Sequence, residues 1–303
     1  MEKSVEDLPD LSIVVPSVNG WGDLRGALAA LCAQRGDLSL EVLVVERVGE
    51  SVRASLRQHF PQAIVIPVTK DVTIPQMRSM AFDVARADIV GVIEDHVIVP
   101  PDWVERMLAE HAAGAQVVGG AVDNAATKTI VDWAAFLCEY SHCLTLPPHG
   151  PALWLTGNNV TYRKSLLQRF RDTLRQGQWE DKLHQAFRDA GIELICQPDI
   201  RVGHKKHYKV HDYASQRFLY SRAYAALRGI NTSFSIRLLY GCAAMALPPL
   251  ILFRITANVL RSRRHGGWLL RSLPLLGVFA FCWATGEAIG YWCGDGGALA
   301  KVC

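Results

Sequence analysis

Three polar side chains that can bind a metal ion follow one apolar run. The run is residues 89–93, Ile-Val-Gly-Val-Ile, and Glu94, Asp95 and His96 come directly after it. Five apolar or small residues in a row are typical of a strand buried on both faces of a parallel sheet. Such sheets bind ligands beyond the carboxyl ends of their strands. Carboxylate and imidazole groups there could hold a divalent cation and a diphosphate, although a solvated turn after a strand is the alternative interpretation.

Two further groups of acidic residues could contribute to a site. Glu46 ends the apolar run 41–46, where it could meet a base or ribose, and an exposed loop acid is the alternative. Glu180 and Asp181 begin a predicted helix, where the helix dipole favours carboxylates. From the residues alone, helix capping is the simpler explanation for this second pair.

The elements that must position these residues alternate between strand and helix. The patterns predict strands at 11–15, 41–46, 63–68, 89–93, 116–121 and 192–196. They predict helices at 21–34, 51–59, 75–86, 129–140, 163–170 and 178–190. This alternation indicates βαβ units, and therefore an α/β fold with a mostly parallel, Rossmann-like sheet flanked by helices.

Neither of the common glycine-rich phosphate-binding motifs occurs in the sequence. The P-loop and the GxGxxG fingerprint are both missing. A nucleotide bound to this sheet would therefore be held by strand-end carboxylates and a metal ion.

The charge of the 303-residue chain is distributed unevenly. The net charge is +3, but from Ser233 onward seven basic residues face two acidic ones, which gives +5 and leaves −2 for the earlier part. This earlier part is not expected to bind nucleic acid. The basic tail is also strongly apolar, which suggests contact with an anionic membrane surface.

The cysteines and the first residues indicate a cellular compartment. The eight cysteines form no CxxC pair and no zinc-binding spacing, which favours a reducing environment. Met1 to Asp10 is acidic and polar and does not read as a secretory signal. Together with the basic, apolar tail, this indicates a membrane-associated protein whose N-terminal part is cytoplasmic.

Two apolar stretches near the C-terminus predict membrane helices. Leu238 to Phe253 is sixteen residues long and contains Pro248-Pro249, whereas a straight spanning helix needs ~20 residues. Leu269 to Cys293 is long enough to span. Because basic residues favour the cytoplasmic side, we expect the first stretch to be re-entrant or interfacial, with a helical hairpin as the alternative. Glu287 would be costly at the bilayer centre and should face protein or lie near headgroups.

The order of six segments resembles the family 2 inverting glycosyltransferases, which have the GT-A fold. The segments are SIVVPSVNG (12–20), EVLVVE (41–46), IPQMRSMAFDVARADIVGVIEDH (74–96), WLTGNNVTYRKSLL (154–167), WEDKLHQAFRDAGIEL (179–194) and RVGHKKH (201–207). The resemblance runs from about Leu11 to Gly229. It implies a catalytic domain at residues 1–230, followed by a membrane-associated helical region at 231–303.

The resemblance implies a role for each candidate residue. It assigns donor binding to a set of residues from four segments: Pro16, Glu46, Arg78, Glu94, Asp95 and Asn158. It assigns metal binding to Glu94, His96 and His204. Asp181 would be the general base, and Glu180 would orient either this base or the acceptor.

The sequence departs from the family pattern in two places. Glu94-Asp95-His96 replaces the usual DxD motif, and because imidazole favours softer ions than Mg²⁺, we expect Mn²⁺ before Mg²⁺ and leave open whether a metal is required. Gln216-Arg217-Phe218 only partly matches the QxxRW motif of processive members, since the tryptophan is missing. We therefore expect transfer of a single sugar.

The expected function is the transfer of a sugar from a nucleotide sugar to an acceptor. A UDP-sugar is expected from family habit, and a lipid or membrane-bound acceptor is expected from the apolar tail. The first alternative is a non-catalytic nucleotide-sugar-binding or scaffold protein on a GT-A fold, and the second is a nucleotidyltransferase.

Overall fold

The chain separates by its internal contacts into two compact units. The structure is a computed structural model that describes residues 8–302, so most of the acidic stretch Met1 to Asp10 lies outside the described residues. Residues 8–123 and 147–204 form the first unit, and residues 124–146 and 205–302 form the second. The functional boundary near residue 230 stays a prediction.

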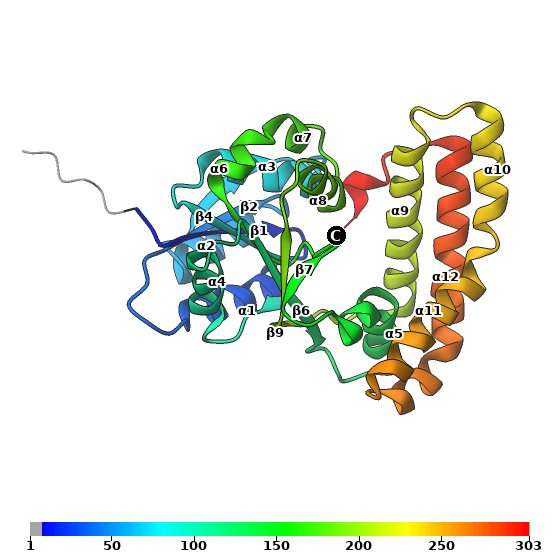
Figure 1. The fold of residues 1–303 in the computed structure, drawn as a ribbon, viewed down its shortest axis with the longest axis horizontal. Coiled ribbons are helices and arrows are strands. Elements are labelled where there is room, and N and C mark those ends of the chain that lie inside the picture. The colour runs from blue at the N-terminus through cyan, green and yellow to red at the C-terminus, as the bar shows by residue number, and fades with distance from the viewer. Residues whose placement is uncertain (1–7, 303) are drawn as a thin grey trace, which may run out of the picture. The chain divides into compact units, whose positions relative to one another are not determined.

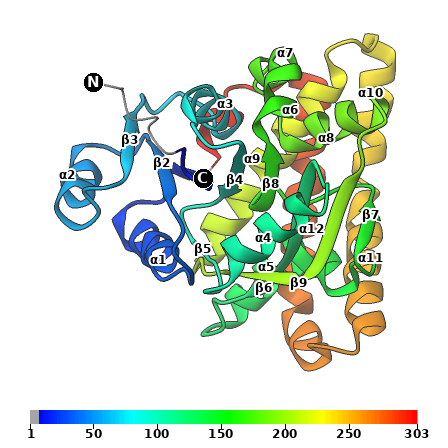
Figure 2. The same cartoon turned by 60° about the vertical axis from the view of Figure 1, so that its left-hand side comes forward.

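The first unit is built on a nine-stranded sheet with the strand order β3-β2-β1-β4-β8-β6-β9-β5. Its parallel part comprises β1 (Leu11–Ser17), β2 (Leu40–Glu46), β3 (Ile64–Pro67) and β4 (Ile89–Ile93). Its other strands are β5 (Val97–Ile98), β6 (Val117–Asn124), β7 (Gly150–Ala152), β8 (Asn159–Arg163) and β9 (Leu194–His204). Strand β8 pairs antiparallel with both β4 and β6, and β7 pairs antiparallel with β9 (Figures 1 and 2).

Helices flank this sheet, as the alternating pattern predicts. They are α1 (Trp21–Cys32), α2 (Glu50–His59), α3 (Ile74–Val84), α4 (Trp103–Ala112), α6 (Lys164–Arg169), α7 (Arg171–Arg175) and α8 (Glu180–Asp189). All residues of β1 and β4 are buried, which explains their nearly uninterrupted apolar sequences. The predicted α/β class with a central sheet between helices is confirmed.

The sequence patterns do not predict β5, β7 or β8, and they end β9 too early. Strands β5 and β7 have only two and three residues. The polar residues Asn159 and Thr161 interrupt the apolar pattern of β8. Both are fully buried, and the Asn159 side-chain amide donates to the backbone carbonyls of Ala121 and Ile200, at 2.9 Å each. Strand β9 does not end at Cys196, as predicted, but continues to His204.

Helix α3 is fixed at its first residue by a capping box. Thr73 accepts a hydrogen bond from the Gln76 backbone N–H, and the Gln76 side chain accepts one from the Thr73 backbone. Pro75 lies in the first turn, where a missing N–H costs nothing. This helix carries Arg78, which is buried.

The second unit is helical. It contains α5 (Ile130–Tyr140), η1 (Ser141–Thr145), α9 (Val210–Gly229), α10 (Phe234–Ala244), α11 (Leu247–Ser262), α12 (Gly266–Cys293) and η2 (Leu299–Lys301). Helix α12 packs against α5, α9, α10 and α11. Gly286 and Gly290 allow its backbone to approach α9, because a Cβ at either position would overlap the carbonyl of Phe218 or Arg222.

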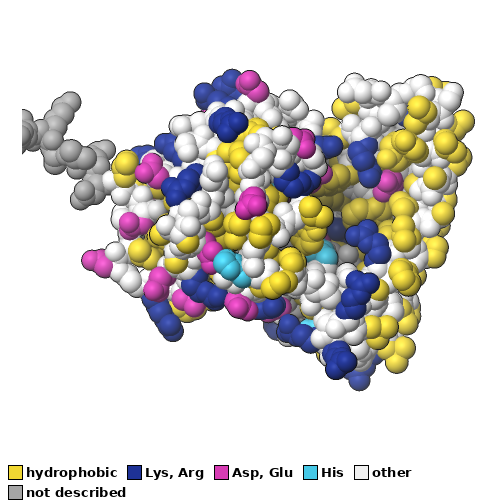
Figure 3. Space-filling model, in the orientation of Figure 1, with side chains coloured by type: hydrophobic (Ala, Val, Ile, Leu, Met, Phe, Trp, Pro, Cys, Tyr) yellow, Lys and Arg dark blue, Asp and Glu magenta, His cyan; other side chains and the backbone are white. Residues whose placement is uncertain are grey.

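The apolar stretches take two forms in this unit. Helix α12 is long and apolar enough to cross a membrane. The other stretch is not one segment, because α10 and α11 are separate helices bent by 54° at a break just before Pro248-Pro249. Figure 3 shows apolar side chains gathered over the part formed by α10, α11 and α12, and Phe234, Phe253 and Leu270 are each about 70% exposed.

Thr73→Ala should lower the stability of the protein. The variant loses the cap of α3, and such a loss typically costs about 1 kcal/mol. The measurement is the urea midpoint of the first unfolding transition of the full-length protein. Thr73→Ser keeps the hydroxyl and should restore the midpoint, and an unchanged midpoint for the alanine variant would show that the cap contributes nothing.

Candidate active site

Strand pairing brings together two histidines that are 108 residues apart in the sequence. Strand β5 pairs antiparallel with β9 (Figure 2). Val97 lies opposite His204 in this pairing. His96 immediately precedes β5, so its ring meets the ring of His204. The two Nε2 atoms are 2.8 Å apart, and the rings meet edge to face.

Glu94 completes a cluster of three groups that could hold a metal ion. Its Oε2 lies 3.3 Å from the Nε2 of His96. One ligand atom from each of Glu94, His96 and His204 lies within 4.8 Å of the other two. One carboxylate and two imidazoles suit a first-row transition ion better than Mg²⁺. Three protein ligands also leave coordination positions for a substrate, so the residues fit the predicted cation.

Asp95 points to the loop between β1 and α1. Its carboxylate accepts hydrogen bonds from the backbone N–H groups of Val18 and Asn19, at 2.7 and 2.8 Å, and from the Asn19 side chain at 2.6 Å. The Asn19 amide also lies 3.1 Å from the Nδ1 of His96. Asp95 is fully buried and holds this loop against β4, and its predicted contact with a donor stays a prediction.

The neighbouring carboxylates determine the protonation of His96 in this cluster. Burial lowers the pKa of His96, but hydrogen bonds to Asp95 and Glu94 outweigh burial and raise the pKa to about 9. Burial raises the pKa of Glu94 and of Asp95, but their contacts with His96 outweigh burial and hold both pKa values below the usual value. The imidazolium is thus the counter-ion of the metal-free cluster, and a metal ion that binds His96 must displace its proton.

Arg78 connects the cluster to the start of α8. Its Nη1 donates to the Oε2 of Glu180 at 2.7 Å, and its Nη2 lies 3.8 Å from the Oε1 of Glu94. Asn158 donates to the other oxygen of Glu94 at 3.1 Å. Arg78 and Asn158 are both buried, so they fix two carboxylates from distant parts of the chain in one site.

The two adjacent acids of α8 have different surroundings. Glu180 points to Arg78, whereas Asp181 is exposed by surface area. Protein atoms near the Asp181 carboxylate still raise its pKa through lost solvation, and the negative charge of Glu180 raises it further. A raised pKa is what a general base near neutral pH requires.

Glu46 and Pro16 lie on two adjacent parallel strands. Glu46 is fully buried and accepts hydrogen bonds from the backbone N–H groups of Val48 and Gly49, while Arg53 lies 3.2 Å away as its counter-ion. Pro16 is buried in β1, one residue before Ser17, which lies opposite Glu46. A contact between either residue and a nucleotide stays a prediction.

Sequence reasoning missed the importance of two residues at this site. Asn19 lies in the loop between β1 and α1. Its position just after a strand that neighbours β4 could have indicated that it belongs to the site. Gly157 precedes Asn158, and a Cβ at this glycine would overlap the carboxylate of Glu180. Only glycine therefore lets Glu180 reach Arg78.

Gly157→Ala should impair activity without unfolding the protein. The added methyl group pushes the Glu180 carboxylate away from Arg78, so the pair that connects α8 to Glu94 is lost. Loss of one charged hydrogen bond predicts a fall of about tenfold or more in turnover. The measurement is the turnover of the activity proposed below, together with the urea midpoint. Gly267→Ala adds a methyl group in open space and should change neither quantity; equal turnover in both variants would contradict the proposed clash.

Comparisons with known proteins identify the family and the fold of the chain. Residues 12–170, more than half of the chain, match the family described as "Glycosyl transferase family 2". None of the curated proteins matches the sequence. A similar solved structure is the mannosyltransferase PcManGT from Pyrobaculum calidifontis in complex with GDP-Man and Mn²⁺, with a TM-score of 0.55 and 16% identity. The similarity covers 93% of this chain and 88% of the other, and at this identity it establishes the GT-A-type fold. The chain belongs to glycosyl transferase family 2.

Proposed function

We propose that this glycosyltransferase moves one sugar, with inversion, from a UDP-sugar to a membrane-associated lipid acceptor. The observation that supports this proposal best is the connection between two groups of residues. The cluster Glu94, His96 and His204 could hold the diphosphate end of a donor, and Arg78 joins it to the acidic start of α8.

The reaction is a single displacement at the anomeric carbon. Asp181 takes the proton of the acceptor hydroxyl, the acceptor oxygen forms the new bond, and the nucleoside diphosphate leaves from the opposite side. Glu180, held by Arg78, orients Asp181 or the acceptor. A divalent ion at Glu94, His96 and His204 would neutralise the negative charge of the leaving diphosphate.

The donor would extend from this cluster along the carboxyl ends of the parallel strands. Glu46 would meet the base or ribose, and Pro16 and Asp95 would shape the loop beside it. Asn158 would contact the donor near Glu94, and Arg78 would face the diphosphate. The resemblance to the family favours a UDP-sugar as the donor. The structural neighbour binds GDP-Man, so GDP-mannose is the alternative donor to test.

The helical unit supports a membrane-associated acceptor. Apolar side chains such as Phe253 and Leu270 are exposed on α11 and α12, and burial of such a side chain in lipid gains roughly 1.5–3 kcal/mol. Helix α12 would span the membrane, and the bent pair α10 and α11 would lie at the interface or re-enter it. The basic residues after α11 would then stay with the catalytic unit on the cytoplasmic side.

Asp181→Asn should abolish transfer and leave donor binding intact. The amide cannot take the acceptor proton, so turnover should fall by about a hundredfold or more. The measurements are sugar transfer and, separately, the thermal shift produced by the nucleotide sugar. Asp189→Asn removes an exposed acid from the same helix and serves as the control. Unchanged turnover in Asp181→Asn would assign the base elsewhere.

Removal of divalent metal should inactivate the enzyme. EDTA should lower turnover to background, and Mn²⁺ should restore it better than Mg²⁺, because two of the three ligands are imidazoles. The assay follows the hydrolysis or transfer of UDP-sugars and of GDP-mannose. Full activity in EDTA would mean that the cluster works without a cation. Binding of the nucleotide sugar without any turnover would favour a scaffold function instead.

A further inference from the structure

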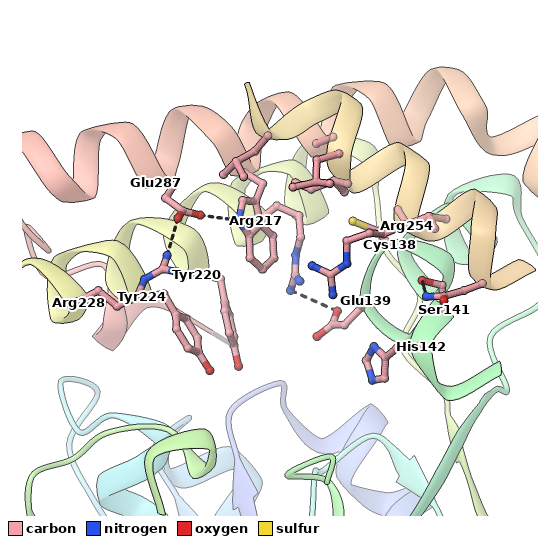
Figure 4. Close-up of a pocket in the computed structure, with 17 residues that line it drawn as sticks. Cys138, Glu139, Ser141, His142, Arg217, Tyr220, Tyr224, Arg228, Arg254 and Glu287 are labelled. Atoms are coloured by element: carbon pink, nitrogen blue, oxygen red, sulfur yellow. Dashed lines mark hydrogen bonds and ion pairs between the residues drawn. The ribbon is translucent and has the colours of Figure 1, made fainter. Parts of the chain in front are cut away.

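The helical unit contains a cavity of about 440 Å³ that the proposed chemistry does not use. This volume is within the range of small-molecule binding sites. Four segments of this unit line the cavity: the end of α5 with η1, α9, α11 and α12 (Figure 4).

One face of α11 forms an apolar wall that ends at a cation. Leu247, Leu250 and Ile251 line the cavity at helical spacing, and Arg254 follows one turn later. Arg254 lies seven positions after Leu247, which is about 10 Å along a helix. Leu250 is half exposed, so the wall continues to the outer surface of the unit.

The facing helices α9 and α12 and the end of α5 place four more charges around the cavity. Arg217 lies 3.2 Å from Glu139, and Arg228 forms an ion pair with Glu287, which also accepts a hydrogen bond from Trp283 at 2.9 Å (Figure 4). The two glutamates are thus matched by two arginines. Glu287 faces protein inside the apolar helix α12, as its sequence position requires.

Arg254 gives the cavity one positive charge in excess. Within residues 8–302, no carboxylate lies within ion-pair distance of its guanidinium, and its side chain is exposed. Burial and, to a smaller extent, the charge of Arg254 together lower the pKa of neighbouring His142 to about 4, so His142 is neutral at pH 7. The exposed guanidinium of Arg254 is therefore the donor that the cavity offers to an anion.

We propose that this cavity binds a phosphate-bearing lipid, with the phosphate at Arg254 and the hydrocarbon chain along Leu247, Leu250 and Ile251. Arginine donors match phosphate oxygens in geometry and charge. The apolar wall that leads out of the cavity suits a long chain and gives a free inorganic phosphate little to contact. The proposal deepens the lipid-acceptor part of the proposed function and rests on it for its biological meaning. The same chemistry occurs in an isoprenoid phosphate acceptor and in an anionic phospholipid.

The test measures the binding of farnesyl phosphate to the full-length protein in neutral detergent. Quenching of tryptophan fluorescence or calorimetry gives the affinity. Arg254→Gln should weaken binding about tenfold or more, because one charged contact is lost. Arg254→Lys should keep part of the affinity. Farnesol, which has no phosphate, should bind weakly to the wild type and equally weakly to Arg254→Gln.

Arg261→Gln is the matched control, because Arg261 lies on the same helix and does not line the cavity. It should bind farnesyl phosphate like the wild type. Equal affinity of the wild type and Arg254→Gln, in a protein with an unchanged circular dichroism spectrum, would overturn the proposal. Equal losses in Arg254→Gln and Arg261→Gln would do so too, since they would indicate non-specific attraction.

A second arm separates the two sources of the lipid. Binding to phosphatidylglycerol vesicles and to phosphatidylcholine vesicles is compared in the same variants. A loss in Arg254→Gln confined to farnesyl phosphate supports an acceptor-type lipid, and a loss confined to phosphatidylglycerol supports an anionic phospholipid. Nucleotide-sugar hydrolysis by the wild type is measured separately. If lipid binding depends on Arg254 but the protein hydrolyses no nucleotide sugar, the proposed function is contradicted and the lipid site is supported.

Discussion

The antiparallel pairing of β5 with β9 is the constraint on which the site depends. Strand β5 is only two residues long, yet it fixes His204 opposite Val97 and therefore beside His96. A shift of one residue in this register would turn His204 to the other face of the sheet. The cluster with Glu94 would then lose one of its three candidate ligands. A minimal strand thus determines whether residues 94–96 form a site or a solvated turn.

Buried charge is the second constraint, and it connects the parts of the site. Carboxylates that are shielded from water need partners, and the partly buried Glu94 has three, in His96, Arg78 and Asn158. Arg78 pairs with Glu94 and also binds Glu180, so the same arginine positions the start of α8. Asp95 satisfies the same need by holding the backbone of the β1 turn. The interactions that compensate these buried charges are therefore the same ones that assemble the site.

The helical unit solves a similar problem among apolar helices. Glu287 would be costly in a helix that crosses a membrane, but Arg228 and Trp283 satisfy its carboxylate. Arg217 likewise lies beside Glu139 and over aromatic rings. Both pairs line the cavity of this unit. The unmatched charge of Arg254 then gives that cavity its preference for an anion.

The sequence by itself determined the α/β class, the first four strands along the chain and the position of Glu94 and His96 at a strand end. Local patterns suffice there, because buried parallel strands are continuously apolar and strand-end residues follow them directly. His204 was expected only from the resemblance to the family, and the pairing of β5 with β9 brings it beside the other two residues. The partnership of Glu180 with Arg78, the requirement for Gly157 and the turn of Asp95 toward Asn19 were decided only by the tertiary structure. Each depends on which distant side chains meet, and no local pattern encodes that. Strand β8 was missed for the same reason, since its polar residues are satisfied by backbone groups far away in the sequence.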